Sequence, residues 1–389
     1  MSKRQLAMVM DLNKCIGCQT CTVACKTQWT NRNGREYMYW NNVETYPGTG
    51  YPKNWMDLGG GFDAAGDLKE GVIPNIEADY GVPWDFNYED VGTYNYTKGD
   101  ATPAFHADST PTWGPNWDED VGKGNFPSDN YFFYLPRICN HCTNPGCLSA
   151  CPRDAIFKRD QDGVVLVDLD RCQGYRYCIA GCPYKKIYFN SKISKSEKCI
   201  LCFPRIEQGL PPACAQQCVG RIRFVGFLDD TEGQVYKLVT KYKVALPLRS
   251  DYGTQPNVYY VPPTEAPAKF DAEGRIIEGS QRVPMTELEL LFGKPVHAAI
   301  KTIKSEKEKR AKTGESELMD ILIAYHHADM FRLDTNYYQD VAKASGNKNP
   351  LAPIDDRYSK GKFTADFSLP FVDEKPHGEG NKTEGNAHA

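Results

Sequence analysis

The sequence contains no hydrophobic run of the length that crosses a membrane. A membrane-spanning helix needs roughly 18 consecutive apolar residues, and no stretch of the 389 residues approaches this length without charges. The N-terminal residues Met1–Ala7 also lack the apolar core of a signal peptide. We therefore expect a partner protein to provide any membrane anchor or export signal.

The sequence also contains few histidines, and its positive and negative charges are nearly balanced. The chain has seven histidines, and its formal net charge of −4 gives no support for nucleic-acid binding. No nucleophile stands in a pattern with a base, and Gly59–Gly61 lacks the strand–helix context of a phosphate-binding loop. The sequence therefore predicts a chain without catalytic residues of its own.

Cysteine, by contrast, is abundant and confined to two stretches. Fifteen cysteines lie within Cys15–Cys25 and Cys139–Cys218. Disulfide frameworks are typical of short secreted chains, where they replace a missing core, and an odd number would leave one cysteine over. In a chain of this length, metal binding is the better interpretation.

The cysteines form four groups with the spacing of cubane iron–sulfur clusters. Thiolates separated by two residues can reach adjacent irons of one cube, while backbone N–H groups of the loop face the sulfurs. The last cysteine of each group points away and ligates the cluster of a partner group. The groups are Cys15-x2-Cys18-x2-Cys21-x3-Cys25, Cys139-x2-Cys142-x4-Cys147-x3-Cys151, Cys172-x5-Cys178-x3-Cys182 and Cys199-x2-Cys202-x11-Cys214-x3-Cys218.

This exchange of the last cysteine predicts four ligand sets. Groups two and three are close in sequence and should form one two-cluster module, which leaves groups one and four to pair across a long separation. The first set is then Cys15, Cys18, Cys21 and Cys218, and the second is Cys25, Cys199, Cys202 and Cys214. The third is Cys139, Cys142, Cys147 and Cys182, and the fourth is Cys151, Cys172 and Cys178.

The fourth set lacks one cysteine. Tyr175 stands where a Cys-x2-Cys-x2-Cys pattern would place the missing ligand. A phenol is a poor ligand for cluster iron beside soft thiolates. We therefore expect three [4Fe-4S] clusters and one [3Fe-4S] cluster, with a [4Fe-4S] cluster that has a non-cysteine ligand as the alternative at the fourth set.

Zinc is the main alternative for the whole pattern. Cys-x2-Cys pairs also build zinc ribbons and knuckles. Zinc sites take four ligands each, so fifteen cysteines would leave one site without its fourth cysteine. A tight Cys-x2-Cys-x2-Cys triple also fits one tetrahedral ion poorly. Iron–sulfur clusters are favoured over both zinc and disulfides.

The chain is expected to have an α+β fold with two bacterial-ferredoxin-like modules. Residues 1–30 and 191–228 would form the two halves of one module, and residues 131–190 the other. Residues 31–130 are rich in Gly, Pro, Asn and aromatics, which predicts a loop-rich but ordered insertion. Residues 229–372 would form a partly helical interface region, and 373–389 a flexible tail.

Several secondary-structure elements can be predicted from residue patterns. Apolar and β-branched runs predict strands at Leu6–Asp11 and Tyr131–Leu135, and a hairpin of Ala155–Lys158 with Val164–Val167 around a polar loop. The predicted helices are Pro284–Phe292, Val296–Lys312 and Glu315–Met330.

Basic side chains near the cysteines are a further feature. They could raise cluster potentials, or they could be solvated surface or structural ion pairs, which we favour for any single one. His141, between Cys139 and Cys142, could donate to a cluster sulfur or only fill space. The basic residues are Lys14, Arg137, Lys185, Lys186, Lys198 and Arg205.

The sequence resembles the four-cluster beta subunits of molybdenum enzymes of the DMSO reductase family. The similarity is to the branch of ethylbenzene dehydrogenase, perchlorate, chlorate and selenate reductases and dimethylsulfide dehydrogenase; nitrate reductase and nitrite oxidoreductase beta subunits are more distant. It covers residues 4–330 approximately. The segments that carry it are Leu12–Lys26, Tyr39–Glu44, Asn116–Asp120, Phe132–Cys151, Ser196–Gln208, Tyr242–Leu248, Pro256–Pro263 and Glu317–Ile323.

This resemblance implies partners and a location. It implies a molybdopterin-containing catalytic alpha subunit on the side of the first set and often a haem b gamma subunit on the side of the [3Fe-4S] cluster. It also implies an aromatic or other non-cysteine residue at the position of Tyr175. Members of the branch are periplasmic and are exported folded on a signal of the alpha subunit; the cytoplasmic face of the membrane is the alternative.

A second function belongs to a different class. A free-standing polyferredoxin would carry electrons between transient partners. The insertion and the C-terminal region argue against it, because a minimal carrier does not need large additions that suit a permanent interface. The sequence therefore predicts a non-catalytic electron-transfer subunit of an oxidoreductase complex.

Overall fold

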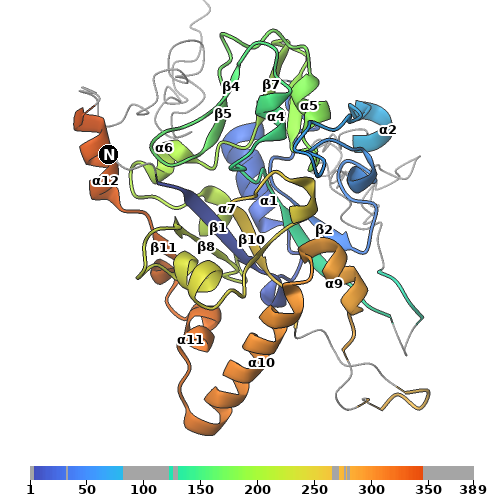
Figure 1. Ribbon diagram of the computed structural model, residues 1–389, viewed down its shortest axis with the longest axis vertical. Helices are drawn as coiled ribbons and strands as arrows, with labels where there is room; N and C mark the ends of the chain where they lie inside the picture. The colour runs from blue at the N-terminus through green and yellow to red at the C-terminus, as the bar shows by residue number, and fades with distance from the viewer. Residues whose placement is uncertain are drawn as a thin grey trace, which may run out of the picture.

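The structure of the protein is a computed structural model in which residues 4–31, 34–81, 122–125, 130–264, 271–275, 277 and 281–344 are described. These residues form a mixed α and β fold around one five-stranded sheet (Figure 1). No described helix is long and apolar enough to cross a membrane. The expected tail at 373–389 and residues 82–121 of the insertion lie outside the described residues.

The central sheet joins the beginning of the chain to its middle and end. Its strand order is β11-β8-β1-β10-β9. Strand β1 runs antiparallel to β8 and parallel to β10. The strands are β1 (Leu6–Asp11), β8 (Arg223–Phe227), β9 (Leu246–Pro247), β10 (Val258–Val261) and β11 (Phe331–Arg332).

Strand β1 is buried on both faces and separates two apolar cores. Successive side chains of a strand point to opposite faces. Leu6, Met8 and Met10 accordingly lie in a first core that contains most of the cysteines. Ala7 and Val9 lie in a second core, which has no cysteine among its described residues.

Three two-stranded sheets support the first core. The predicted strand Leu6–Asp11 and the predicted hairpin are confirmed, the hairpin as β4 (Ile156–Lys158) with β5 (Val165–Val167). The strand predicted at Tyr131–Leu135 begins two residues later. The other pairs are β2 (Asn42–Tyr46) with β3 (Phe133–Arg137), and β6 (Ile187–Asn190) with β7 (Lys195–Lys198), a hairpin that the sequence analysis missed.

The helices near the cysteines are short, and the longer ones lie in the C-terminal region. The short ones are α1 (Thr20–Cys25), α2 (Ile76–Tyr80), α4 (Gly146–Ser149), α5 (Tyr177–Gly181), α6 (Phe203–Ile206), α7 (Ala213–Gln216) and α8 (Gln234–Tyr236). Single 3-10 or π turns lie at Leu12–Lys14, Lys26–Thr30, Trp55–Asp57, Lys237–Lys241, Ser250–Tyr252 and His327–Met330.

Four helices follow in the described C-terminal region: the long helix Val296–Thr313 projects from the end of the molecule opposite to α4, α5 and the β4–β5 hairpin, whereas Thr335–Ala344 lies beside the N-terminal end of the chain (Figure 1). They are α9 (Met285–Phe292), α10 (Val296–Thr313), α11 (Glu317–Ile323) and α12 (Thr335–Ala344). The first two agree with the predicted Pro284–Phe292 and Val296–Lys312.

The single helix predicted at Glu315–Met330 is wrong. Helix α11 ends at Ile323, and Ala324 takes a left-handed conformation with φ of 51°. Tertiary contacts use the carbonyls that a longer helix would have paired. Lys14 Nζ donates to the Leu322 carbonyl, and Arg221 Nη1 donates to those of Ala324 and Tyr325.

Candidate metal centres

All four cysteine groups share one local structure. In each group the last cysteine but one is the second residue of a short helix. The last cysteine follows four residues later, after one helical turn. The pairs are Cys21 and Cys25 at α1, Cys147 and Cys151 at α4, Cys178 and Cys182 at α5, and Cys214 and Cys218 at α7.

The loops of groups one and three have the same backbone conformation. Gly17 and Gln19, on either side of Cys18, both have positive φ, and so do Gly174 and Arg176 on either side of Tyr175. A Cβ on Gly17 would come within 2.5 Å of the ring of Tyr134, which explains the glycine there. Tyr175 therefore occupies the backbone position that Cys18 occupies in group one, and its side chain is 56% exposed.

The central sheet brings groups one and four together. Strands β1 and β8 pair just before Cys15 and just after Cys218, and α1 packs against α7. Burial, together with the neighbouring thiols of Cys21 and Cys218, raises the pKa of Cys15 to about 12. Three of the four predicted members of the first set are therefore close together; Cys18 lies in the same loop and is exposed.

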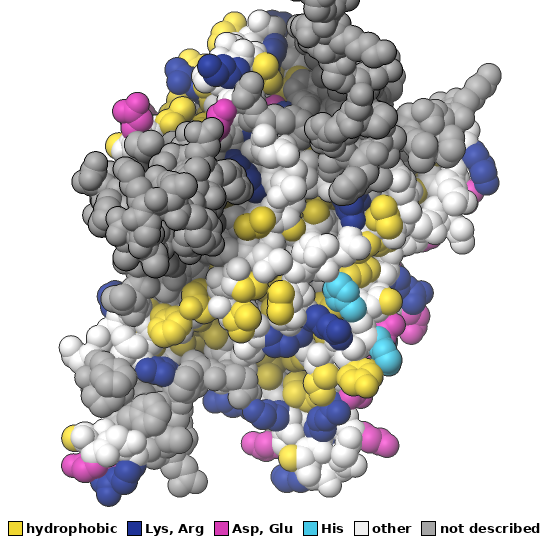
Figure 2. Space-filling view, turned by 180° about the vertical axis from the view of Figure 1, so that it is seen from behind, with side chains coloured by type: hydrophobic (Ala, Val, Ile, Leu, Met, Phe, Trp, Pro, Cys, Tyr) yellow, Lys and Arg dark blue, Asp and Glu magenta, His cyan; other side chains and the backbone are white. Residues whose placement is uncertain are grey.

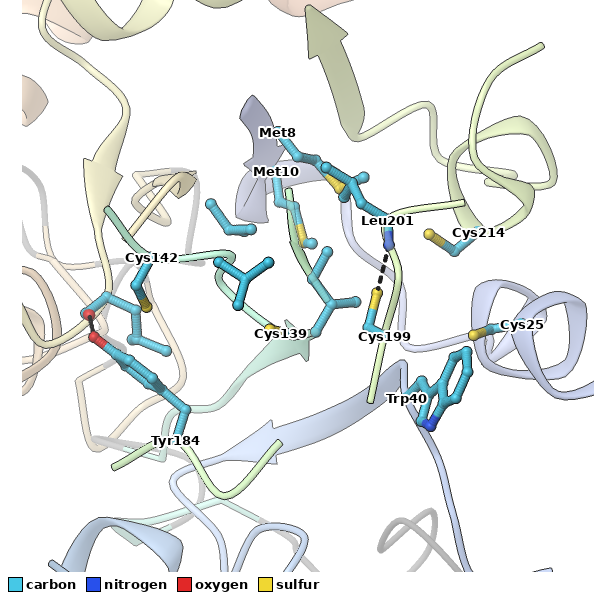
Figure 3. Close-up of a cluster of buried hydrophobic side chains, with 14 of the residues drawn as sticks. Met8, Met10, Cys25, Trp40, Cys139, Cys142, Tyr184, Cys199, Leu201 and Cys214 are labelled. Carbon is cyan, nitrogen blue, oxygen red and sulfur yellow. Dashed lines mark hydrogen bonds between the residues drawn. The ribbon is translucent and has the colours of Figure 1, made fainter. Parts of the chain in front are cut away.

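The second predicted set also converges. Burial raises the pKa of Cys25, and the nearby thiols of Cys199, Cys214 and Cys202 add to this effect. Figure 3 shows the sulfurs of Cys25, Cys199 and Cys214 turned toward a common space beside Trp40. The group-one cysteine Cys25 thus lies among group-four cysteines, as the exchange of ligands requires.

The third predicted set surrounds one cavity. Cys139, Cys142, Cys147 and Cys182 all line it, together with Pro145, Gly146 and Lys186. Cys182 comes from group three, and the other three cysteines come from group two. The predicted exchange of ligands between these two groups thus brings four thiols to one cavity.

The fourth predicted set forms a group of three thiols. Burial, together with the nearby thiols of Cys172 and Cys151, raises the pKa of Cys178 to about 12. The Sγ of Cys178 and the Oγ of Ser196 are 3.4 Å apart.

Contacts between the sets place them in a line. Cys214 of the second set is near Cys21 of the first, and Cys199 of the second set is near Cys139 of the third. Cys182 of the third set is near Cys178 of the fourth. The order along the molecule is therefore first, second, third and fourth.

The ends of this line reach the surface, while its middle is buried. Every cysteine of the second and third sets is buried. In the first set Cys18 is exposed and Cys15 and Cys218 are partly exposed, and in the fourth set Cys151 is partly exposed. An electron could therefore enter at one face and leave at another without exposing the central thiols to water.

The state of the thiols fits metal binding better than disulfide bonds. All fifteen cysteines are free. Burial raises the pKa of Cys214 to about 12, so this thiol keeps its proton at neutral pH until a cation displaces it. No three described His, Cys, Asp or Glu side chains converge closely enough for a single metal ion.

Hydrogen-bond donors face sulfurs of the first, second and fourth sets, and Lys198 Nζ donates to Cys139 Sγ of the third over 3.5 Å. Backbone amides of Ile222, Leu201, Ala155 and Ser196 donate to Cys218, Cys199, Cys151 and Cys172 over 3.5, 3.3, 3.4 and 3.5 Å. The Trp29 indole donates to Cys202 Sγ over 3.1 Å. Such donors compensate the negative charge of thiolate-bound clusters.

Buried cations complete the environment, and they correct the expectation of solvated surface. Lys185, Lys186, Lys198 and Arg223 are at most 2% exposed. None of the four forms an ion pair with a described carboxylate, whereas the buried Arg35 and Arg137 pair with Glu197 and Glu44. Unpaired buried cations are costly unless an anion lies nearby. An iron–sulfur cluster with four thiolates is such an anion.

Arg137 and Arg205 have structural roles. Arg137 Nε and Nη2 donate to Glu44 Oε1, which agrees with the expected ion pair. Arg205 Nε donates to the Pro211 carbonyl over 3.0 Å and so closes the loop before Cys214.

His141 is neutral and fixed in orientation. Burial lowers its pKa well below the ordinary value, and the nearby Lys198 lowers it further. The Val165 amide donates to Nδ1 over 3.1 Å, so the remaining proton is on Nε2, which has no described partner. The residue is therefore able to donate to an acceptor from Nε2.

The sequence analysis missed several side chains that contact thiols, among them Arg223, Trp29 and Ser196. Arg223 and Trp29 follow their nearest cysteines by five and four residues, outside the immediate flanks considered. Ser196 is part of the unpredicted β6–β7 hairpin. A strand prediction after Pro183 would have indicated Ser196, but no pattern in the sequence indicates that Trp29 reaches Cys202.

The residues therefore fit iron–sulfur clusters: converging thiols, a cavity lined by four of them, amides aimed at sulfur and buried cations without carboxylates. Comparison with known families agrees. The model of a 4Fe-4S dicluster domain matches residues 130–228, and that of a 4Fe-4S binding domain matches residues 6–27.

Curated relatives match nearly the whole chain. The dimethylsulfide dehydrogenase subunit beta of Rhodovulum sulfidophilum is 60% identical over 333 residues, which are 86% of this chain and 100% of that protein. The selenate reductase subunit beta of Thauera selenatis is 57% identical, covering 85% and 99%. The nitrate reductase beta chain of Bacillus subtilis is 39% identical, covering 67% and 72%, although that of Haloferax mediterranei reaches 55%, covering 85% and 94%.

Proposed function

Because the chain belongs to the family of iron–sulfur beta subunits of dimethylsulfide dehydrogenase and the selenate, chlorate and perchlorate reductases, we propose that it relays electrons through three [4Fe-4S] clusters and one [3Fe-4S] cluster. The chain itself is non-catalytic in this proposal. It accepts electrons at one face and delivers them at another.

The proposed ligands are the four sets of thiols. The first, second and third sets each supply four thiolates to a [4Fe-4S] cluster. The fourth supplies Cys151, Cys172 and Cys178. The line of contacts through Cys21 and Cys214, then through Cys199 and Cys139, supports an electron path in this order.

Tyr175 is proposed to leave the fourth cluster one iron short. Its flanking residues have the same left-handed conformation as those around Cys18, so the backbone would direct a cysteine at this position toward the cluster. The phenol is more than half exposed, and a hard oxygen competes poorly for this iron.

Two exposed regions are proposed as partner interfaces. Around the first set, apolar side chains of Ile16, Val23, Val219, Ile323 and Tyr325 are 51–76% exposed. Lys14 and Arg221 tie the segment with Ile323 and Tyr325 to the loops of Cys15 and Cys218. A molybdopterin-containing catalytic alpha subunit would cover this region.

The other proposed interface lies at the fourth set, where Tyr175 and Tyr177 are 56% and 58% exposed. A haem b gamma subunit or another redox partner would dock there. The face of the molecule seen in Figure 2 carries exposed hydrophobic side chains with Lys and Arg between them, and exposed apolar side chains that lie together are a feature of interaction surfaces.

The location is proposed to be periplasmic, after export as a folded complex on the signal of a partner. The cytoplasmic face of the membrane is the alternative. Fractionation of the native complex distinguishes the two.

The observation that carries the proposal is the line of four thiol sets with a buried middle and exposed ends. The test is anaerobic purification followed by iron analysis and electron paramagnetic resonance. We expect about fifteen irons per chain and, in the oxidised protein, a sharp [3Fe-4S] signal near g = 2 of roughly one spin. The variant Tyr175→Cys should lose that signal and gain about one iron; Tyr177→Cys, on the same exposed turn, should keep it.

Far fewer irons, or an oxidised protein without this signal, contradicts the assignment. Copurification distinguishes the two candidate functions, a subunit of a complex and a free-standing carrier. A molybdenum-containing partner that stays bound through gel filtration supports a subunit, and a chain that purifies alone with full iron supports a free-standing polyferredoxin.

A further inference from the structure

Arg223 lies between two of the thiol sets. It is the first residue of β8, it is fully buried, and it stands opposite Met10 of β1. Its guanidinium is held by Asn41, whose Oδ1 accepts from Nη2 over 2.7 Å. The position of this cation is therefore fixed by the central sheet and by a neighbouring side chain.

The two ends of the guanidinium contact different sets. Nη2 donates to Cys21 Sγ of the first set over 3.4 Å. Nη1 donates to Cys214 Sγ of the second set over 3.6 Å. One planar cation thus joins sulfurs of neighbouring centres, a geometry for which the fork of an arginine is suited.

The charge of Arg223 has no other described counterpart. No described carboxylate forms an ion pair with it, and its Nε has no described hydrogen-bond partner. An arginine guanidinium is not deprotonated in proteins, so Arg223 is a buried cation.

Other cations near the line contact at most one sulfur. Lys198 Nζ reaches Cys139 Sγ over 3.5 Å, but its other bonds go to backbone carbonyls. Lys14 Nζ donates to the carbonyls of Arg221 and Leu322, forms an ion pair with Asp11 over 3.7 Å and lies near Cys218 of the first set. Among the described cations, Arg223 is thus the one that hydrogen-bonds to sulfurs of two sets.

We propose that Arg223 is a positioning residue that raises the reduction potentials of the first and second clusters together and screens the repulsion between them. The proposal rests on the cluster assignment above. A reduced cluster carries more negative charge than an oxidised one, so a fixed cation and its hydrogen bonds to sulfur favour reduction. Because the same cation acts on both clusters, it shifts their two reduction potentials in the same direction, so the difference that drives electron transfer between them changes little.

The test is a redox titration of each cluster, followed by electron paramagnetic resonance, in the complete chain with its native partners. In Arg223→Met we expect the midpoint potentials of the first and second clusters to fall, while those of the third and fourth stay unchanged. In Arg223→Lys, one ammonium cannot reach both sulfurs, so one of the two potentials should be restored and the other should stay low. Lys14→Gln is the matched control and should lower only the first.

Each possible outcome either supports or contradicts the proposed role of Arg223. With four clusters retained, unchanged potentials or a shift of only one cluster in Arg223→Met overturns it. If that variant does not retain iron, Arg223→Gln keeps hydrogen bonds without charge, and both potentials must again fall. A purely structural role would lower iron content without moving potentials. A wild-type chain without four clusters would refute the proposed function instead, and iron analysis detects that separately.

Discussion

The two faces of the central sheet obtain their stability in different ways. The side of Leu6, Met8 and Met10 packs against thiols and is surrounded by buried cations. The side of Ala7 and Val9 packs against aliphatic residues of α10 and α11, such as Ile303 and Leu318. One strand therefore serves a core that is complete only with metal and a core that is complete by itself.

The difference follows from the groups that each core buries: charged groups and thiols in the first core, and only apolar side chains in the second. Buried cations and raised thiol pKa values are costly in an empty first core and become favourable when an anionic cluster is present. The second core needs only the removal of apolar surface from water, at roughly 25 cal/mol per Å². Metal removal should therefore damage the first core, and cavity formation should damage the second.

The largest effect is expected for a thiol of the first core. Cys214→Ser should lose the second cluster, because serine oxygen is a poor substitute for a buried soft thiolate. Iron content should fall by about one cluster, and the loss of stability should exceed that of any single substitution in the second core. Iron analysis and thermal unfolding under argon check this.

Gln217→Ala, at the exposed end of the same helix, is the control and should retain all iron. If Cys214→Ser kept its full iron content, the difference between the two cores would disappear.

An intermediate effect is expected from a cavity in the second core. Leu318 is fully buried, and Leu318→Ala should cost about 2–5 kcal/mol of unfolding free energy without loss of iron. Denaturant unfolding and iron analysis of the same sample measure both. Ile323→Ala removes a side chain of the same helix that is 51% exposed and should change stability by less than about 0.5 kcal/mol. Iron loss in Leu318→Ala would mean that the cores are not independent.

The smallest effect is expected from an ion pair at the edge of the second core. Hydrogen bonds from Lys241, Tyr242 and Lys237 lower the pKa of Glu317 from its ordinary value of 4.5 to about 2. The stabilisation is complete above about pH 4.5 and is lost as the pH falls toward 2. Because this carboxylate is largely exposed, water screens the pairs, and Glu317→Gln should cost less than about 1 kcal/mol.

Denaturant unfolding from pH 7 to pH 4 should show a constant difference between wild type and Glu317→Gln above about pH 5 and a smaller one at pH 4. Added salt should also reduce it. A difference that grows as the pH falls would contradict the assigned direction.

Much of the fold near the cysteines could be predicted because it depends on local rules. The strand Leu6–Asp11 and the hairpin of Ile156–Lys158 with Val165–Val167 follow from short β-branched runs and a polar turn. The β6–β7 hairpin escaped prediction because Lys195–Lys198 is polar. Its burial depends on contacts of Ser196 and Lys198 with thiols and on the ion pair of Glu197 with Arg35. The end of α11 at Ile323 likewise results from Lys14 and Arg221, which are distant in sequence.

The sequence by itself determined the kind of centre, because thiol spacing and the residues of each loop act within a few bonds. It also determined that one position, Tyr175, differs from the cysteine pattern. Only the tertiary structure decided which side chains distant from the cysteines in sequence reach the sulfurs. It also decided the order of the four thiol sets in space. Arg223 meets Cys21 because β1 and β8 pair across more than 200 residues, and a contact of that range depends on packing of the whole chain.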